Sequence, residues 1–196
     1  MKYSPDAYLL HESNRFITFN IRIKVVMKDM VKPDALRKAA EKAFCRFPYY
    51  SKQIRIDDDG GIDLIPNPRT ISVSPVSSKR TYLFSEEVNY QPCSIEYEDN
   101  CIYFNMYHGI CGGCGTFMWV KTTIYEYICA NYGVHPEPGT TIMADTPVSE
   151  EEYAFPKLEV LPDDTPLGKL KKDEVWFPGL EYLLLNDPPK MVYRST

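Results

Sequence analysis

The sequence predicts an α/β (α+β) fold in two layers, with a mixed, largely antiparallel sheet and helices packed on one face of it. Apolar and polar residues alternate along residues 15–28, 93–97 and 101–107, which is the pattern of half-buried strands. Elsewhere, apolar residues recur at intervals of three and four, which predicts two amphipathic helices. The combination of long strands and long helices excludes an all-helical or all-strand protein.

The first half of the chain contains a strand, a helix and a short hairpin. After the strand at 15–28, Pro33 suits the first turn of a helix, where its missing N–H costs nothing. We expect this helix to end at Pro48, because the residue before a proline disfavours the helical conformation. Its apolar face comprises Leu36, Ala39, Ala40, Ala43, Phe44 and Phe47. Short strands are expected at 52–56 and 62–65, joined by a turn at 57–61.

The second half begins with loop-forming residues 66–91, which are rich in Pro and Ser and contain one short strand near residues 71–73. The hairpin at 93–107 follows, and then a helix through Phe117 and Ala130 that ends at Gly133. We divide the chain into a lobe at residues 1–138 and a Pro-rich crossover arm at residues 139–196, with a strand near 174–177. This arm is expected to lead toward a second lobe or a partner.

Composition limits the classes of function. The 196 residues carry 22 Lys and Arg against 27 Asp and Glu, a net charge of -5, which is unsuited to nucleic-acid binding. No apolar run reaches the roughly 18 residues of a membrane span, and residues 1–10 do not have the pattern of a secretion signal. The six cysteines do not form the dense framework of a small secreted domain, so we expect reduced thiols and a cytoplasmic protein.

A candidate site lies where the last strand of the hairpin meets the second helix. His108 follows Tyr107 at the end of the strand, and the Gly-rich turn 109–115 opens the helix. Glycines allow a substrate to approach closely, and a helix N-terminus favours developing negative charge. A neutral imidazole can take a proton from a hydroxyl or amine as that group attacks a carbonyl. The alternative is that His108 is a hydrogen-bonded packing residue.

The sequence of this turn resembles the HxxxDG segment of the chloramphenicol acetyltransferase and condensation-domain superfamily. The similar residues are His108 to Gly113, Gly115, Phe117, Val120 to Thr123, and Glu126 with Tyr127. The most similar branch is that of bacterial alcohol-acetyltransferase-like proteins. The element order and the Arg46-Phe-Pro48 end of the first helix also resemble the N-terminal lobe of that group, over nearly the whole chain.

The resemblance implies transfer of an acyl group from a coenzyme A or pantetheine thioester to a hydroxyl or amine. The motif His is the general base, which corresponds to His108. Tyr107, Gly109, Gly112 and Gly113 would belong to the motif and the substrate channel. No bound cofactor is implied, because acyl-CoA would be a co-substrate. The motif Asp, which holds the His loop through an ion pair, is replaced by Gly112, and Tyr107 stands where many members have a second His.

The resemblance covers only the first lobe of two-lobed members, so a second lobe or a second copy of the chain is expected to complete the channel. This leaves a different class of function open. The chain can be an inactive binding or structural module that keeps the fold, as Gly112 and the absent second-lobe segment suggest. The sequence of the full-length gene would separate these two hypotheses.

Cys111 and Cys114 form a CxxC spacing at the helix start and offer a third hypothesis, a thiol-redox protein, because helix N-termini favour thiolates. A thiol titration that finds no cysteine of low pKa would remove it. The default interpretation is that both thiols pack as small apolar groups. We predict no metal site, since the chain has three histidines and no second CxxC or HxxxH spacing.

Overall fold

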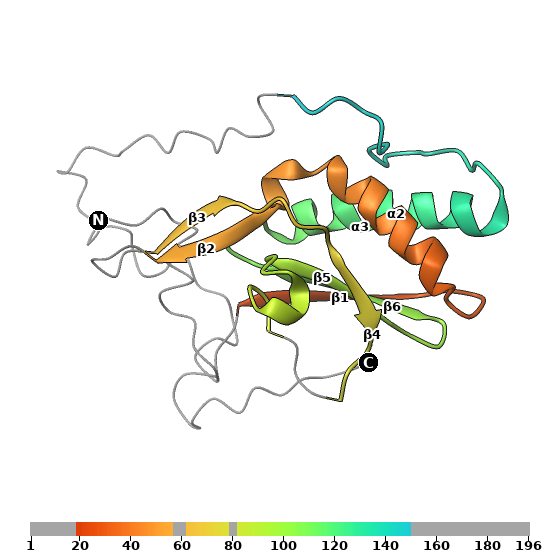
Figure 1. Ribbon diagram of the computed structural model, residues 1–196. Coiled ribbons are helices and arrows are strands. Elements are labelled where there is room, and N and C mark those ends of the chain that lie inside the picture. The colour runs from red at the N-terminus through yellow and green to blue at the C-terminus, as the bar shows by residue number, and fades with distance from the viewer. Residues whose placement is uncertain (1–18, 57–61, 79–81, 150–196) are drawn as a thin grey trace, which may run out of the picture. The chain divides into compact units, whose positions relative to one another are not determined.

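The computed structural model describes residues 19–56, 62–78 and 82–149 of the chain (Figure 1). Several predicted features lie outside these residues. They are the start of the first strand, the turn at 57–61, and all of the crossover arm beyond residue 149, including the strand expected near 174–177.

A four-stranded sheet forms one layer of the fold. It contains β1 (Asn20–Val26), β4 (Ser72–Pro75), β5 (Cys93–Glu98) and β6 (Cys101–Tyr107), in the spatial order β1-β6-β5-β4. The pairs β1–β6 and β5–β6 are antiparallel, whereas β4 and β5 are parallel. The predicted mixed, largely antiparallel sheet is therefore confirmed, and so is the hairpin between β5 and β6.

Two helices form the second layer, on one side of the sheet (Figure 1). They are α2 (Pro33–Cys45) and α3 (Gly113–Tyr132), which pack against each other. The backbone N–H of Lys32, at the start of α2, donates a hydrogen bond to the Tyr127 hydroxyl of α3 at 3.0 Å. Lys42 of α2 pairs with the Glu126 carboxylate of α3 at 2.7 Å. The two contacts join the start and the last turn of α2 to α3.

The helix ends agree with the predictions except at the C-terminus of α2. This helix ends at Cys45, three residues before the expected end at Pro48, and a 3₁₀ turn, η1 (Pro48–Tyr50), follows. Phe47 has a ψ of 59°, because Pro48 excludes the helical conformation from the residue before it. At the other helix, Gly133 caps α3 with a positive φ of 64°, as predicted.

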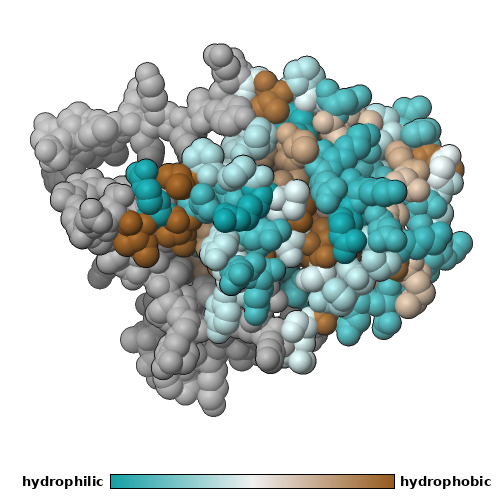
Figure 2. All heavy atoms as spheres, in the orientation of Figure 1, coloured by the Kyte–Doolittle hydropathy of each residue, from teal (hydrophilic) through white to brown (hydrophobic). Residues whose placement is uncertain are grey.

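The hydrophobic core lies between the helices and the sheet. Alternation along β5 and β6 points Ile95 and Phe104 toward the helices, where both are fully buried. The Phe104 ring meets the edge of the Trp119 ring of α3 at a centroid distance of 5.2 Å. Leu36 and Phe47 complete the fully buried centre of this cluster. Figure 2 shows that the described residues form a mostly hydrophilic surface on the face turned to the viewer in Figure 1. The exposed Lys and Glu side chains of α2 agree with this surface.

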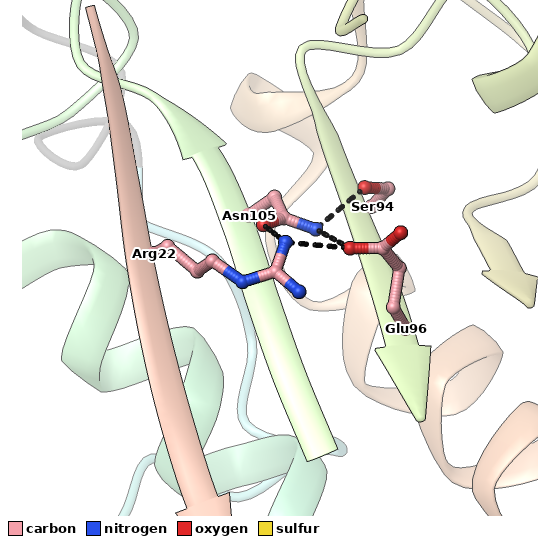
Figure 3. Close-up of polar contacts among 4 residues, drawn as sticks. All are labelled: Arg22, Ser94, Glu96 and Asn105. Atoms are coloured by element: carbon pink, nitrogen blue, oxygen red, sulfur yellow. Dashed lines mark hydrogen bonds and ion pairs between the residues drawn. The ribbon is translucent and has the colours of Figure 1, made fainter. Parts of the chain in front are cut away.

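The opposite face of the sheet carries polar side chains, of which Ser94, Glu96 and Asn105 are buried and Arg22 is half exposed. The Arg22 guanidinium lies 2.6 Å from the Glu96 carboxylate and 2.8 Å from the Asn105 side-chain oxygen (Figure 3). The Asn105 amide in turn donates to the Glu96 carboxylate and to the Ser94 hydroxyl, at 3.0 and 3.1 Å. This network joins β1, β6 and β5 across three strands, and it lies two residues before the end of β6.

The short hairpin predicted after the first helix is present as β2 (Lys52–Ile56) and β3 (Ile62–Pro66), in a separate two-stranded sheet. Residues 139–149, the described start of the arm, contact α3, since the Thr122 hydroxyl donates to the Ile142 carbonyl at 2.6 Å. Among the described residues, no helix has the length and apolar character needed to cross a bilayer.

Candidate active site at the end of strand β6

His108 is exposed directly after the end of the sheet's buried inner strand. Its backbone N–H donates to the Phe19 carbonyl at 2.7 Å, which continues the pairing of β1 with β6 by one residue. The N–H of Tyr107 donates to the Pro92 carbonyl at 2.8 Å on the other side. The backbone is therefore held from both neighbouring segments, while the imidazole remains accessible to solvent. A side chain in this position can exchange protons with a molecule that binds outside the sheet.

Tyr107, the residue before His108, is only 3% exposed and lies beneath the turn. Its ring meets the edge of the Phe84 ring at 5.3 Å, and a Cβ added to Gly109 would lie 2.4 Å from a carbon of the Tyr107 ring. A glycine is needed at position 109, because any side chain there would collide with the packed Tyr107 ring. The buried Tyr107 ring therefore packs against the backbone of the turn at Gly109.

Gly112 and Gly113 differ from Gly109 in their surroundings. Both are exposed, and a Cβ added to either would meet no atom within 4 Å. Gly112 is the N-cap of α3 and provides no side chain to bond the free N–H groups of the first helical turn. An uncapped helix N-terminus with open space in front of it attracts negative charge, as develops on a carbonyl oxygen under attack.

Cys111 and Cys114 have different environments. All six cysteines lie in the described part of the chain and are free thiols. Cys114 is exposed, whereas Cys111 is half-buried with its sulfur 3.3 Å from the Thr116 hydroxyl. Burial raises the pKa of the Cys111 thiol, against smaller opposite effects of hydrogen bonds from Thr116 and Tyr50. A raised pKa disfavours the thiolate that redox chemistry requires. Across the residues described, no three His, Cys, Asp or Glu side chains gather in a way that could hold a metal ion.

Two residues at this site were missed by the sequence analysis, Tyr50 and Thr116. Tyr50 comes from η1 and is 3% exposed, with its hydroxyl hydrogen-bonded to Cys111. Thr116 is fully buried in the first turn of α3, and its hydroxyl donates to the Gly112 carbonyl at 3.1 Å. A helical threonine four residues after a carbonyl often bonds it, so Thr116 was recognisable from sequence. Nothing near Tyr50 in the sequence signals a partner 61 residues away.

No protein-family model matches the sequence, and no curated protein matches it. Similarity is found among solved structures. The chain resembles polyketide synthase associated protein 5 from Mycobacterium tuberculosis with a TM-score of 0.50 and 16% identity, over 76% of this chain and 37% of that one. It also resembles the starter condensation domain of rhizomide synthetase RzmA, with a TM-score of 0.44 and 13% identity, over 61% of this chain and 34% of that one.

The chain therefore spans little more than a third of the length of the solved structures to which it is similar. Its mixed sheet with two helices on one side is the fold that it shares with polyketide synthase associated protein 5, in agreement with the predicted fold class. At this level of identity the similarity concerns the fold, and the chemistry has to be argued from the residues of the site.

Proposed function

We propose that this chain is an acyltransferase-like lobe that moves an acyl group from a coenzyme A or pantetheine thioester to a hydroxyl or amine. The observation that carries the proposal is the exposed His108 at the end of β6, next to the uncapped N-terminus of α3. A general base and a group of backbone N–H donors then lie on either side of one turn, which is what attack on a carbonyl needs.

In the proposed reaction, the His108 imidazole takes the proton of the acceptor O–H or N–H as that atom attacks the thioester carbonyl. The new C–O or C–N bond forms, and the carbonyl electrons move onto oxygen, near the N–H groups at the start of α3. When the tetrahedral intermediate collapses, the C–S bond breaks. The thiolate that leaves takes the proton back from the imidazolium, so His108 ends neutral.

A completing partner is part of this proposal. A Cβ added to Gly112 or Gly113 would meet no atom within 4 Å, so the start of α3 leaves room for a substrate. The solved relatives are almost three times as long as this chain's matched part, so a second lobe or a second copy would provide the other wall. A water-excluding channel of this kind strengthens the electrostatic contribution of the helix N-terminus.

The decisive experiment compares acyl transfer by the full-length gene product with that of its His108→Ala variant, using acyl-CoA and a mixture of alcohols and amines. Loss of a general base is expected to lower turnover by about 10²- to 10⁴-fold. His135→Ala is the matched control, because His135 is also exposed but follows α3 rather than β6. Equal turnover in the wild type and in His108→Ala contradicts the proposal.

One observation favours a second candidate, an inactive binding module of the same fold. Gly112 occupies the position at which the resembled motif has its Asp, so no carboxylate is available at that residue to hold the His turn. If this candidate is correct, the wild type and His108→Ala will both transfer no acyl group, yet both will bind the same acyl-CoA or partner with equal affinity.

A further inference from the structure

Three side chains from different segments meet at the turn that presents His108. Tyr50 comes from η1, Cys111 from the turn itself, and Thr116 from the first turn of α3. The Cys111 sulfur lies 3.3 Å from the Thr116 hydroxyl and is hydrogen-bonded to the Tyr50 hydroxyl. The cluster thus links the turn to an element that is distant in sequence and to the helix that follows it.

The hydroxyl and thiol groups of this cluster can each donate and accept a hydrogen bond. The Thr116 hydroxyl donates to the Gly112 carbonyl at 3.1 Å, and between this hydroxyl and the Cys111 sulfur either atom can be the donor. The Tyr50 hydroxyl is hydrogen-bonded to Cys111 and also to Tyr49. The resulting chain of hydrogen bonds runs from Tyr50 through Cys111 and Thr116 to the backbone of Gly112.

Packing leaves this cluster little freedom to move. The Tyr50 ring stacks on Phe47 at a centroid distance of 5.4 Å and meets Tyr49 edge-on at 4.6 Å. A Cβ added to Gly115 would lie 2.9 Å from the Tyr50 hydroxyl oxygen and 3.0 Å from the Cys111 Cβ. The absence of a side chain at Gly115 is therefore what lets Tyr50 and Cys111 meet over the helix start.

We infer that Cys111 is a positioning residue, held by the hydroxyls of Tyr50 and Thr116, that fixes the turn from His108 to Gly112. The resembled motif would brace this turn with a carboxylate at position 112, where this chain has a glycine. The neighbouring thiol takes over the bracing by neutral hydrogen bonds. The inference rests on the proposed function, because it assigns to Cys111 the task of keeping the general base in place.

The positioning can be measured without activity, by NMR of the histidine imidazoles in the full chain. There are three histidines, so the His108 signal is assigned by its loss in His108→Gln. In Cys111→Ala we expect the His108 signal to shift and broaden while that of His135 stays unchanged. Cys111→Ser, which keeps a donor and an acceptor, should restore the wild-type signal. Cys114→Ala is the matched control and should leave both signals unchanged.

Kinetics of the same variants provide the second readout. Misplacement of the base should lower kcat in Cys111→Ala by about 10- to 100-fold with little change in KM, and Cys111→Ser should recover most of this loss. Tyr50→Phe removes one hydroxyl at nearly constant volume, so it gives the same test if Cys111→Ala does not fold. Tyr132→Phe, which removes an exposed hydroxyl bonded to Asp29, is its control.

The outcomes separate this inference from the proposed function. An unchanged His108 signal in both Cys111→Ala and Tyr50→Phe overturns the positioning role, whatever the activity. If the wild type transfers no acyl group but the His108 signal responds as expected, the proposed function fails while the bracing of the turn is upheld. Equal losses of kcat in Cys111→Ala and Cys111→Ser would also contradict the inference, because only the alanine variant removes the hydrogen bonds of residue 111.

Discussion

The Arg22 guanidinium of β1 lies 2.6 Å from the Glu96 carboxylate of β5, across the intervening strand β6. Glu96 has only 5% of its side chain exposed, whereas Arg22 is about half exposed. The carboxylate therefore depends on its partners for the hydrogen bonds that water would otherwise supply. This pair stabilises the sheet from the side that the helices do not cover.

Replacing Arg22 by Met should lower the free energy of unfolding by about 1–3 kcal/mol, because a buried carboxylate loses a charged partner. Urea unfolding of the two proteins measures the difference. Arg37→Met is the control. Arg37 pairs with Asp34 at 3.5 Å on an exposed face of α2, and this pair should contribute within about 0.5 kcal/mol. In the double variant with Glu96→Gln, part of the lost stability should return, and further loss there would contradict the explanation.

The Lys42–Glu126 pair predicts how stability depends on alkaline pH. The hydrogen bond to Glu126 raises the pKa of Lys42 above its ordinary value of 10.5. The pair therefore contributes its full stability below that value, and the contribution is lost as the pH rises through the folded-state pKa. Since Lys42 is largely exposed, we expect Lys42→Met to lose only about 1 kcal/mol at neutral pH.

Urea unfolding between neutral pH and about pH 12 checks this expectation, with the range set by the ordinary lysine pKa. The difference in stability between the wild type and Lys42→Met should shrink as the pH rises above 10.5. Lys38→Met, on the same exposed side of α2, is the matched control and should show no such trend. A difference that stays constant over the whole range would show that the ion pair is not its source.

Gly109 and Gly112 should respond differently to the same substitution. Gly109→Ala places a Cβ against the buried Tyr107 ring and should cost about 1–3 kcal/mol, as overpacking does. Gly112→Ala meets no neighbouring atom and should leave stability nearly unchanged. Thermal unfolding of both variants measures this, and similar losses in both would contradict the close approach of Tyr107 to the turn.

The sequence predicted those parts of the fold that depend on local pattern. The alternation in β6 and the periodicity of α3 each follow from a few neighbouring residues, as does the glycine cap at residue 133. The end of α2 was predicted three residues late, at Pro48, because the effect of a proline on the residue before it places a helix end only approximately. The resemblance at His108 could be proposed because it rests on contiguous residues, and the role of His108 stays a prediction.

The contacts that hold the turn at His108 and the sheet beside it could not be predicted from local sequence pattern. Tyr50 reaches Cys111 only after η1 folds back over the start of α3, and Arg22 reaches Glu96 only through the strand order of the sheet. Such contacts depend on topology, which single-sequence periodicity does not specify. Gly109 illustrates the same limit, since its need for a glycine arises from the buried ring of Tyr107 and not from a turn with positive φ.

The pairing of β1 with β6 joins residues that are 75 to 87 positions apart, from Val26 opposite Cys101 at the hairpin end to Asn20 opposite Tyr107. The hairpin and α3 are contiguous in the chain and can assemble early, whereas an interaction over that separation carries a large loop-closure cost and forms late. The carbonyl of Phe19, which holds the backbone of His108, arrives with β1. A partly folded form without β1 would keep the contact of Tyr107 with Pro92 but lack the Phe19 carbonyl that holds the His108 backbone, so the placement of this imidazole depends on the pairing of distant segments.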